Sequence, residues 1–433
     1  MLSLYRFLPR GFCQAHASLR FLLAVLTALV AGTAVSANLM SLSLMDAVQS
    51  AERHAPELRA RAAGVTAAEA AVGPAGQLPD PEPIVGLQNL PVTGDDAFST
   101  TRDFMTMRTV GIAQQLPRRE KRRLRSERAA TDVDRERALL TNEQLVVREA
   151  VARSWIAAAS AEHRLTLLTA LQPRANAQLA AATAALTAGR ATAAEGIAAR
   201  SAIATLQDRL DAARADRDTA RTELARWLPD LGDRPLGEPP DWRDLGGDPE
   251  SLVRNIAHHR ELLAYDAAER AATADVALAR AEKRPDWSLE FAYAQRGPQF
   301  SNMVSVQFRV PLALFAAHRQ DQLIASKQAL VTRIDAERQA AQRMHGAELR
   351  KTLTTWRSAA DRLARYEREL LPLSEDRADA VIAAYRGGRG DLTASLRALD
   401  EATEQRLAYT DLQNTLGQAW ATLYFAFPTE RTP

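Results

Sequence analysis

The sequence is poor in cysteine, in aromatic residues and in excess charge of either sign. Its single cysteine, Cys13, lies in a segment that we expect to be removed, so the mature chain is predicted to lack disulfides, a cysteine nucleophile and cysteine-ligated metal sites. Lysine and arginine number 55 against 53 aspartates and glutamates, which gives no reason to expect binding to nucleic acid. The sequence also lacks a recognisable catalytic triad, phosphate loop or dinucleotide fingerprint, so we expect neither an enzyme nor a bound cofactor.

Long hydrophobic runs are missing except near the N-terminus. After residue 37 the chain has no apolar stretch of about eighteen residues, so any contact with a membrane must use β-strands or the protein surface. Residues 1–37 are predicted to be a signal peptide, because Arg6, Arg10 and Arg20 precede the apolar run 21–31 and small residues precede the expected cleavage site. No lipobox cysteine follows the apolar run, so no lipid anchor is predicted.

The chain is instead rich in alanine, leucine, arginine and glutamate, which favours long helices, and it repeats itself. The first repeat is predicted to span 38–228 and the second 251–428, with a linker at 229–250 and a short tail at 429–433. Chance similarity between two alanine-rich halves is the alternative, but it does not explain matched prolines and glycines. The matched positions are Leu78-Pro79-Asp80 with Arg284-Pro285-Asp286, and Pro173 and Gly189-Arg190 with Pro372 and Gly388-Arg389.

Each repeat is predicted to contain the same elements in the same order. A first helix is followed by two strands, a very long helix, a Gly-Arg turn and a closing helix. Pro173 and Pro372 interrupt the long helical patterns and are expected to kink or end a segment, whereas Trp155 and Trp356 are expected in the core. The predicted helices span 44–73, 118–188 and 191–228 in the first repeat and 251–283, 313–387 and 392–425 in the second.

The strands are clearest in the second repeat, in the predicted hairpin 286–312. Apolar residues such as Trp287 and Phe291 alternate there with polar ones, which is typical of a sheet with one apolar and one polar face. In the first repeat the predicted hairpin 83–116 contains a polar loop, and its alternation is weaker. If the sheet forms part of a barrel wall, the polar positions that face the lumen are Ser288, Glu290, Ser305, Gln307 and Arg309.

The lengths of these elements constrain the assembly. A helix of about seventy residues rises roughly 105 Å, several times the hydrocarbon thickness of a bilayer, whereas strands of about ten residues match tilted transmembrane strands. Four strands are too few to close a membrane barrel, and open strand edges in hydrocarbon leave backbone groups unsatisfied. We therefore expect the chain to assemble, with about eight strands in a dimer or twelve in a trimer.

In their order and spacing these features resemble the outer membrane efflux protein family, the TolC-like exit ducts, over residues 40–428. The resemblance implies a mainly α fold with a small β part, in which a homotrimer forms a long α-helical barrel and a twelve-stranded transmembrane β-barrel. It also implies the outer membrane of a Gram-negative bacterium, a large periplasmic extension, a periplasmic adaptor and an inner-membrane RND-type pump. The motifs that carry the resemblance are Leu78-Pro79-Asp80-Pro81, Arg284-Pro285-Asp286-Trp287, Gln115-Leu116-Pro117, Val310-Pro311-Leu312 and the two Gly-Arg turns.

Two segments of the first hairpin, residues 86–91 and 105–115, are similar to the branch of this family that serves heavy-metal efflux pumps. The resemblance thus implies a passive exit duct of a tripartite efflux system whose substrates are heavy-metal cations. Drug efflux and type I protein secretion are the alternatives for such a duct. A periplasmic coiled-coil adaptor or structural protein is the alternative from another class, although adaptors need more short soluble β-domains than this sequence contains.

The two Gly-Arg turns are the main candidate functional site. Glycine tolerates the left-handed geometry of a helix C-cap, so a plain cap is one interpretation. The resemblance places the periplasmic mouth and the adaptor contact here, on Gly189, Arg190, Thr192, Gly388, Arg389, Asp391 and Thr393. Family members carry acidic residues at the mouth where this chain has Ala394 and Arg397, so its candidate aperture charges are Arg397, Asp400 and Glu401.

Other patterns have a structural interpretation beside a functional one. Met105 and Met107 are predicted to share one face of a strand, where thioethers suit Cu(I), but apolar packing is the commoner role. His258 and His259 lack a third ligand at a suitable spacing, so no metal site is predicted. The basic run 118–125 lacks interleaved aromatics, which favours a barrel–helix junction over nucleic-acid binding. The isolated histidines are His54, His163, His318 and His345.

Overall fold

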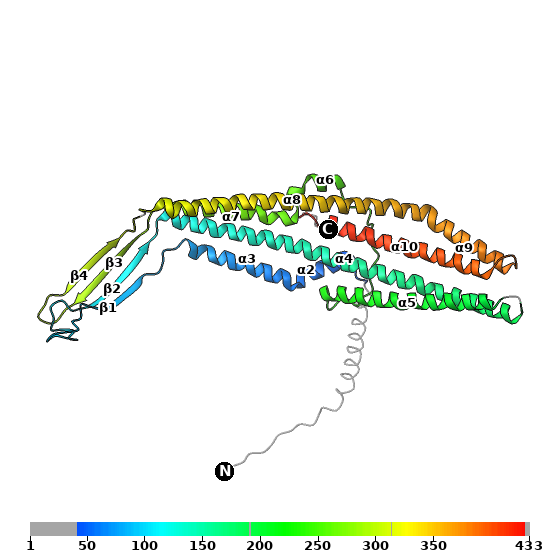
Figure 1. Cartoon of the computed structure of the whole chain (residues 1–433), viewed down its shortest axis with the longest axis horizontal. Helices are drawn as coiled ribbons and strands as arrows, with labels where there is room; N and C mark the ends of the chain where they lie inside the picture. Colours follow the sequence, from blue (N-terminus) through cyan, green and yellow to red (C-terminus); the bar gives the residue numbers. More distant parts are fainter. Residues whose placement is uncertain (1–40, 190–191, 313, 429–433) are drawn as a thin grey trace, which may run out of the picture.

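The protein is long and narrow, with a small sheet at one end and helices over the rest of its length (Figure 1). The computed structural model describes residues 41–189, 192–312 and 314–428. The predicted signal peptide, Arg190 and the tail 429–433 lie outside these residues. The mainly helical chain with a small sheet agrees with the predicted fold class. Within the described part of the chain, no helix is both long and apolar enough to cross a membrane.

The sheet is antiparallel, and its four strands lie in the order β1-β2-β3-β4. β2 and β3 pair although they are far apart in sequence, and their register places Val110 opposite Tyr293 and Ile112 opposite Phe291. These four side chains share one face because successive side chains of a strand point to opposite faces. The alternation predicted for the second hairpin is thus confirmed. The strands span Glu82–Gln88 (β1), Met107–Leu116 (β2), Trp287–Gln295 (β3) and Met303–Arg309 (β4).

The second strand of the first hairpin begins later than predicted. β2 starts at Met107, and Met105 lies in the connection before it, so the prediction that the two methionines share a strand is wrong. Asp103 explains the difference, because its carboxylate accepts hydrogen bonds from the backbone N–H groups of Met105 (2.7 Å) and Thr106 (3.1 Å). These bonds hold the residues in a turn instead of a strand.

The longest element is α4, which spans the 69 residues Arg119–Thr187 and runs from the sheet to the opposite end of the molecule (Figure 1). Helix α5, Ala193–Trp227, returns beside it. Pro173 does not end a segment, because α4 continues through it. Proline removes one backbone hydrogen bond, but Leu171 packs with Leu210 of α5 in a buried cluster, and tertiary packing of this kind supplies most of the stability of a helix in a protein.

The second long helical stretch is interrupted, unlike the first. A π-helical segment precedes α9, and Pro372 lies in the first turn of that helix, where its missing N–H removes a hydrogen bond to the preceding turn. The stretch also begins later than residue 313, after a short 3-10 turn. The elements are η4 (Ala316–His318), α8 (Gln320–Arg365), η5 (Tyr366–Leu370), α9 (Leu371–Arg386) and α10 (Leu392–Tyr424).

Both regions predicted as single first helices are divided, so these two predictions are wrong. The first divides at Ala55, whose ψ of 121° is not helical, because a residue before proline avoids helical geometry. The second divides at residues 255–262, which we call the joint, where His259 has an extended backbone with ψ 138°. The elements are α2 (Leu44–His54), α3 (Pro56–Ala75), α6 (Pro249–Arg254), η2 (Ile256–His258), η3 (Arg260–Leu262) and α7 (Leu263–Ala281).

The largest hydrophobic core lies near the middle of the helices. Trp155 of α4 and Trp356 of α8 are buried in it, as predicted, together with Trp420 of α10. Residues 228–248 form turns against this core and supply two of the carbonyl groups that the tryptophans need. The indole N–H groups donate from Trp155 to Leu42 (3.0 Å), from Trp356 to Trp242 (2.8 Å) and from Trp420 to Asp244 (2.7 Å).

Candidate functional site

Both Gly-Arg turns lie at the end of the molecule opposite the sheet, where α4 leads into α5 and α9 into α10 (Figure 1). Gly189 has φ +68° and Gly388 has φ +70°, the left-handed region that glycine tolerates. At the second turn the Gly388 N–H donates to the Tyr385 carbonyl (3.0 Å), and the Arg389 N–H donates to the Ala384 carbonyl (2.9 Å). Both glycines therefore cap helices, and the Arg389 side chain is left exposed at the turn.

Thr192 and Asp391 begin the two returning helices. The Thr192 hydroxyl accepts from the Glu195 N–H (3.3 Å), and the Glu195 carboxylate accepts from the Thr192 N–H (2.6 Å), which completes a capping box. Asp391 accepts from the Ala394 N–H at 3.0 Å and so caps α10. Thr393 is half-buried in the first turn of the same helix. Thr192 and Asp391 thus have a structural role at the turns where a partner contact is predicted.

Two of the three candidate aperture charges form ion pairs. Asp400 of α10 pairs with Arg209 of α5 at 2.8 Å, and Glu401 pairs with Arg377 of α9 at 2.7 Å. Arg397 is exposed and has no carboxylate partner within the described residues. Asp400 thus connects the α4–α5 hairpin to the α9–α10 hairpin. Arg209 was not predicted as a site residue, because 191 positions separate it from Asp400 and no local sequence pattern indicates such a pair.

A groove of about 320 Å³ lies between α4, α5 and α10, close to the turns. It brings together Thr393, Arg397 and Asp400, which belong to the predicted site, with Arg209. Mixed walls of this kind, apolar with a few charged groups, suit the docking of a helix. The apolar part of the wall includes Leu171, Leu179, Leu206, Leu396 and Leu399.

The five residues predicted to face a lumen lie on one face of the sheet. Glu290 lies opposite Gln307, and Ser288 lies opposite Arg309. The Arg309 guanidinium contacts Glu290 Oε2 at 2.5 Å and Gln307 Oε1 at 2.8 Å. Ser305 lies two positions before Gln307 on the same strand and shares this face. This face is therefore polar, and Arg309 and Glu290 on it are paired with each other.

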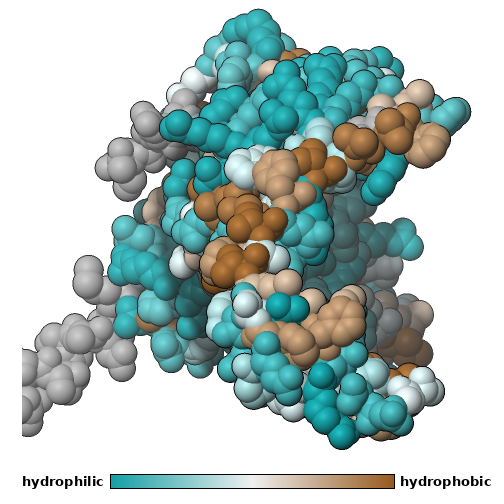
Figure 2. Space-filling view, turned by 90° about the vertical axis from the view of Figure 1, so that its left-hand side faces the viewer, coloured by the Kyte–Doolittle hydropathy of each residue, from teal (hydrophilic) through white to brown (hydrophobic). Residues whose placement is uncertain are grey.

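The opposite face of the sheet is apolar and uncovered. Val85 is 81% exposed and Val306 67% exposed, although a soluble protein rarely leaves a contiguous apolar surface in water. Figure 2, which views the molecule from the sheet end, shows apolar side chains gathered in a band across this end. The exposed apolar residues on this face are Val85, Leu87, Val110, Ile112, Trp287, Leu289, Phe291, Tyr293, Val304, Val306 and Phe308.

The predicted basic run begins where α4 leaves the sheet. Lys121 is buried and pairs with Asp286, which precedes β3, at 3.0 Å. The Arg118 backbone N–H donates to the same carboxylate at 3.2 Å. Part of the run therefore fixes the connection between strand and helix. Within the described residues, no group of three or more histidines, cysteines, aspartates or glutamates is arranged to hold a metal ion.

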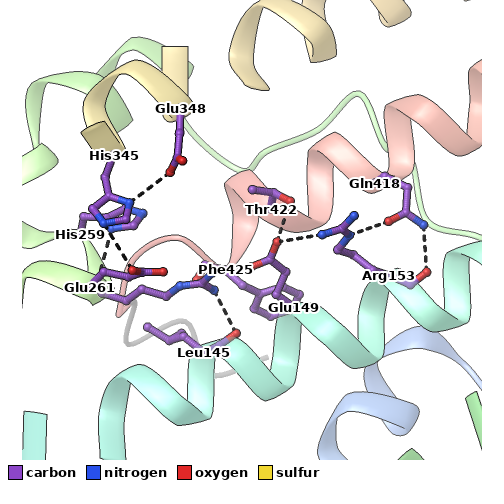
Figure 3. Close-up of polar contacts among 11 residues, drawn as sticks. Leu145, Glu149, Arg153, His259, Glu261, His345, Glu348, Gln418, Thr422 and Phe425 are labelled. Atoms are coloured by element: carbon purple, nitrogen blue, oxygen red, sulfur yellow. Dashed lines mark hydrogen bonds and ion pairs between the residues drawn. The ribbon is translucent and has the colours of Figure 1, made fainter. Parts of the chain in front are cut away.

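A buried polar cluster that the sequence analysis missed surrounds the joint (Figure 3). Arg260 Nη2 pairs with Glu149 of α4 at 2.5 Å, and each side chain is only 11% exposed. Thr422 of α10 donates to the same carboxylate at 2.7 Å. Arg260 also donates to the backbone carbonyls of Leu145 (3.2 Å) and Phe425 (3.3 Å). Buried charges need such partners, so the cluster connects the joint to α4 and to the end of α10.

Two histidines complete this cluster. His259 of the joint and His345 of α8 are both buried and stack with ring centroids 5.1 Å apart, so the prediction that His345 is isolated is wrong. The His345 ring nitrogens face Glu261 Oε2 (3.3 Å) and Glu348 Oε2 (3.2 Å). Burial, followed by the nearby charges of His345 and Arg260, lowers the pKa of His259 to about 4.

Comparisons with known proteins identify the fold. No family model and no curated protein matches the sequence. Among solved structures, a membrane protein from Pseudomonas aeruginosa is similar with a TM-score of 0.75 and 17% identity, over 88% of this chain and 93% of that one. CusC, studied for its transmembrane channel formation, has a TM-score of 0.73 and 16% identity over 90% and 93% of the two chains. The outer-membrane channel OprN has a TM-score of 0.74 and 18% identity over 88% and 89%.

Proposed function

We propose that this protein is an outer membrane channel of the TolC-like efflux family, which conducts substrates passively out of the periplasm. The observation that carries the proposal is the uncovered apolar face of a four-stranded sheet at one end of very long helices. Water disfavours such a face, whereas the acyl chains of a membrane cover it without cost. The fold shared with OprN, an outer-membrane channel, supports the same function.

The channel is a homotrimer in this proposal. Within the described residues, no strand pairs with the outer edge of β1 or of β4, and a membrane does not tolerate open edges. Three copies that pair β4 of one with β1 of the next close a barrel of about twelve strands. The face with Glu290 and Arg309 then lines the lumen, and the apolar face contacts lipid. The repeats 38–228 and 251–428 each supply one strand pair and one helical hairpin, with 229–250 between them.

The Gly-Arg turns form the periplasmic mouth in this proposal, where a periplasmic adaptor bound to an inner-membrane RND-type pump docks. The groove beside the turns, with its apolar wall and the charges of Arg397 and Asp400, supports the docking of adaptor helices there. Thr192, Arg389 and Thr393 lie around this end. The ion pair of Arg209 with Asp400 holds the two hairpins together, so opening of the mouth requires that it break.

Cell fractionation tests the channel proposal. The protein should be found in the outer membrane and should yield trimers that resist dissociation in detergent extracts. A soluble periplasmic monomer would contradict the proposal and favour the alternative of a coiled-coil adaptor or structural protein. Cross-linking of cysteines introduced at Val85 on β1 and Val306 on β4 would then decide whether neighbouring copies pair at their edges.

Heavy-metal cations are the proposed substrates. The support is the resemblance of residues 86–91 and 105–115 to the heavy-metal branch of the family. A strain that lacks the protein should be hypersensitive to copper, silver, zinc, cobalt or cadmium salts, and a plasmid copy should restore growth. Hypersensitivity only to dyes, bile salts or antibiotics would replace metals with drugs as substrates. A defect only in protein export would point to type I secretion.

A further inference from the structure

We propose that the joint, residues 255–262, is an acid-sensitive contact that holds the base of α10, residues 415–425, and releases it when a second proton enters the His259–His345 pair. The two rings stack in a buried site where α4, α8 and the end of α10 meet (Figure 3). The chain therefore contains a titratable pair at a point where three long helices are connected.

His345 lies between two carboxylates. Each of its ring nitrogens faces a carboxylate oxygen, that of Glu261 at 3.3 Å and that of Glu348 at 3.2 Å. An ionised carboxylate only accepts hydrogen bonds, so both contacts are hydrogen bonds only when both ring nitrogens carry protons. The closed joint thus places a carboxylate against each ring nitrogen of His345, on the α8 side of the pair.

His259 is placed to remain neutral. Its Nδ1 accepts a hydrogen bond from the Glu261 backbone N–H at 3.4 Å, and so caps the short η3 helix. A proton on Nδ1 removes this acceptor. The Phe427 ring lies perpendicular to the His259 ring, with centroids 5.6 Å apart, and its carbon atoms offer a charged imidazolium no conventional hydrogen bond. The closed geometry therefore disfavours the second proton.

On balance, the charged groups around His259 also lower its pKa. Burial lowers the pKa of His259 most strongly, and its interactions with His345 of α8 and Arg260 of the joint lower it further. Glu149 of α4 acts in the opposite direction, but Arg260 already pairs with it at 2.5 Å. Glu261 of the joint and Glu348 of α8 are the remaining acids, and both contact His345 instead.

Arg260 connects the histidine pair to α10. Its backbone N–H donates to the Ala426 carbonyl at 3.1 Å, and its guanidinium donates to the Phe425 carbonyl at 3.3 Å. It is flanked by His259 and Glu261, so a movement of the joint that separates the two rings also moves Arg260. Its Nε is buried without a hydrogen-bond partner within the described residues, so the closed joint leaves one donor unsatisfied. Opening of the joint would thus loosen the base of α10.

The expected size of the effect follows from the pKa of His259. The pKa is about 4 in the closed joint and 6.5 in a free histidine. The equilibrium constant for opening of the joint should therefore rise by about two orders of magnitude between neutral pH and pH 4. Helix α10 carries the mouth residues Asp391 and Asp400 at its other end, so a loosened base of α10 would also favour release of the mouth. The effect on the mouth rests on the proposed function, whereas the acid sensitivity of the joint does not.

The test is a distance measurement in the full-length protein. Spin labels on Thr415→Cys of α10 and Arg350→Cys of α8, both at exposed positions, report the distance across the joint by double electron–electron resonance. A second, longer distance should appear on acidification from about pH 7.5 to 4.5. His259→Asn, whose side-chain oxygen still caps η3 but does not titrate, should abolish it. His163→Asn, at an exposed position of α4, should leave it unchanged.

Two results would overturn the proposal: no second distance at low pH, or the same second distance in His259→Asn. If His259→Asn does not fold, His345→Gln decides, because loss of the neighbouring charge lets the closed joint accept a proton on His259 more readily. Its open fraction at pH 4.5 should then be smaller than that of the unmodified pair, and an equal or larger fraction would reject the proposal. The labels report no conductance, so an acid response in a protein that forms no channel would refute the proposed function alone.

Discussion

The sheet end and the helical middle differ in how much apolar surface the chain itself covers. In the middle, Trp155 is completely buried and its indole N–H is hydrogen-bonded. On the sheet, Phe291 is 49% exposed and Val306 67% exposed, on a face that no other described element packs against. The middle therefore contains the interactions that stabilise it in water, whereas the sheet requires an apolar environment from outside the chain.

The largest effect should come from the core of the middle. Trp155→Ala should lower the free energy of unfolding by about 3–5 kcal/mol, because it leaves a large cavity and removes the hydrogen bond from the indole to the Leu42 carbonyl. Phe291→Ala, which removes an aromatic side chain from the uncovered face, should cost less than about 1 kcal/mol in detergent, where the cavity term is absent. Denaturant unfolding of both variants measures the difference. Equal losses would mean that the sheet face is packed in solution.

The buried ion pair of the joint should come next. Glu149→Gln leaves the Arg260 guanidinium buried without its charge partner, and should cost about 3–4 kcal/mol. Glu223 pairs with Arg226 on the surface, with both side chains at least 60% exposed, so Glu223→Gln is a suitable control. That control should change stability by less than about 0.5 kcal/mol. A similar loss in the two variants, measured by denaturant unfolding, would remove the distinction between a buried and an exposed pair.

The two faces of the sheet should differ in their tolerance of charge. Val306→Lys places a cation on the apolar face and should cost about 2–4 kcal/mol of stability in a bilayer. Gln307→Lys, one residue along on the polar face, should cost much less, because that face is proposed to line the lumen. Folding into lipid vesicles measures both. If Gln307→Lys is the worse variant, the proposed assignment of the faces is reversed.

Acid should weaken the middle through His259. The folded pKa of about 4 lies below the ordinary value of 6.5, so the unfolded chain binds more protons between these values. Stability is therefore fully present above pH 6.5 and is lost as the pH falls toward 4, by at most roughly 3 kcal/mol. The loss should be missing in His259→Asn when unfolding is measured across this pH range. An identical pH profile in the variant would assign acid sensitivity to other groups.

The smallest effect on stability should come from the mouth. Arg209 is paired with both Asp400 (2.8 Å) and Glu404 (2.7 Å), but these acids are more than half exposed. Arg209→Ala should therefore cost only about 0.2–1 kcal/mol. In the proposed channel it should nevertheless raise the open fraction, which conductance measures. A large loss of stability without a change in conductance would make the pair structural only.

Elements with a clear period were predictable, and those set by tertiary packing were not. The strand that contains Trp287 and Phe291 was predictable because apolar side chains alternate with polar ones, with a period of two, along an amphipathic strand. The continuation of α4 through Pro173 depends on leucines packed from other helices, which no local pattern records. The joint was missed for the same reason, since His259 acquires its partner His345 only when α7 and α8 pack together.

The candidate site was predictable in its turns but not in its ion pairs. Gly189 and Gly388 were identifiable because glycine is the residue that the left-handed cap requires. Asp400 was found from the order of the motifs, but its partner Arg209 lies on a different hairpin. Such pairs follow from the packing of helices, and the sequence shows only that charges of both signs are present.

Single-channel recording in planar bilayers tests the central claim most directly. Protein extracted from the outer membrane and shown to be folded and oligomeric should give discrete current steps, and Arg209→Ala should give larger or longer steps. The same protein with Val306→Lys should insert less often, whereas Gln307→Lys should insert normally. Folded, oligomeric protein that gives no current steps, even with Arg209→Ala, would contradict the proposal that this chain forms a membrane channel.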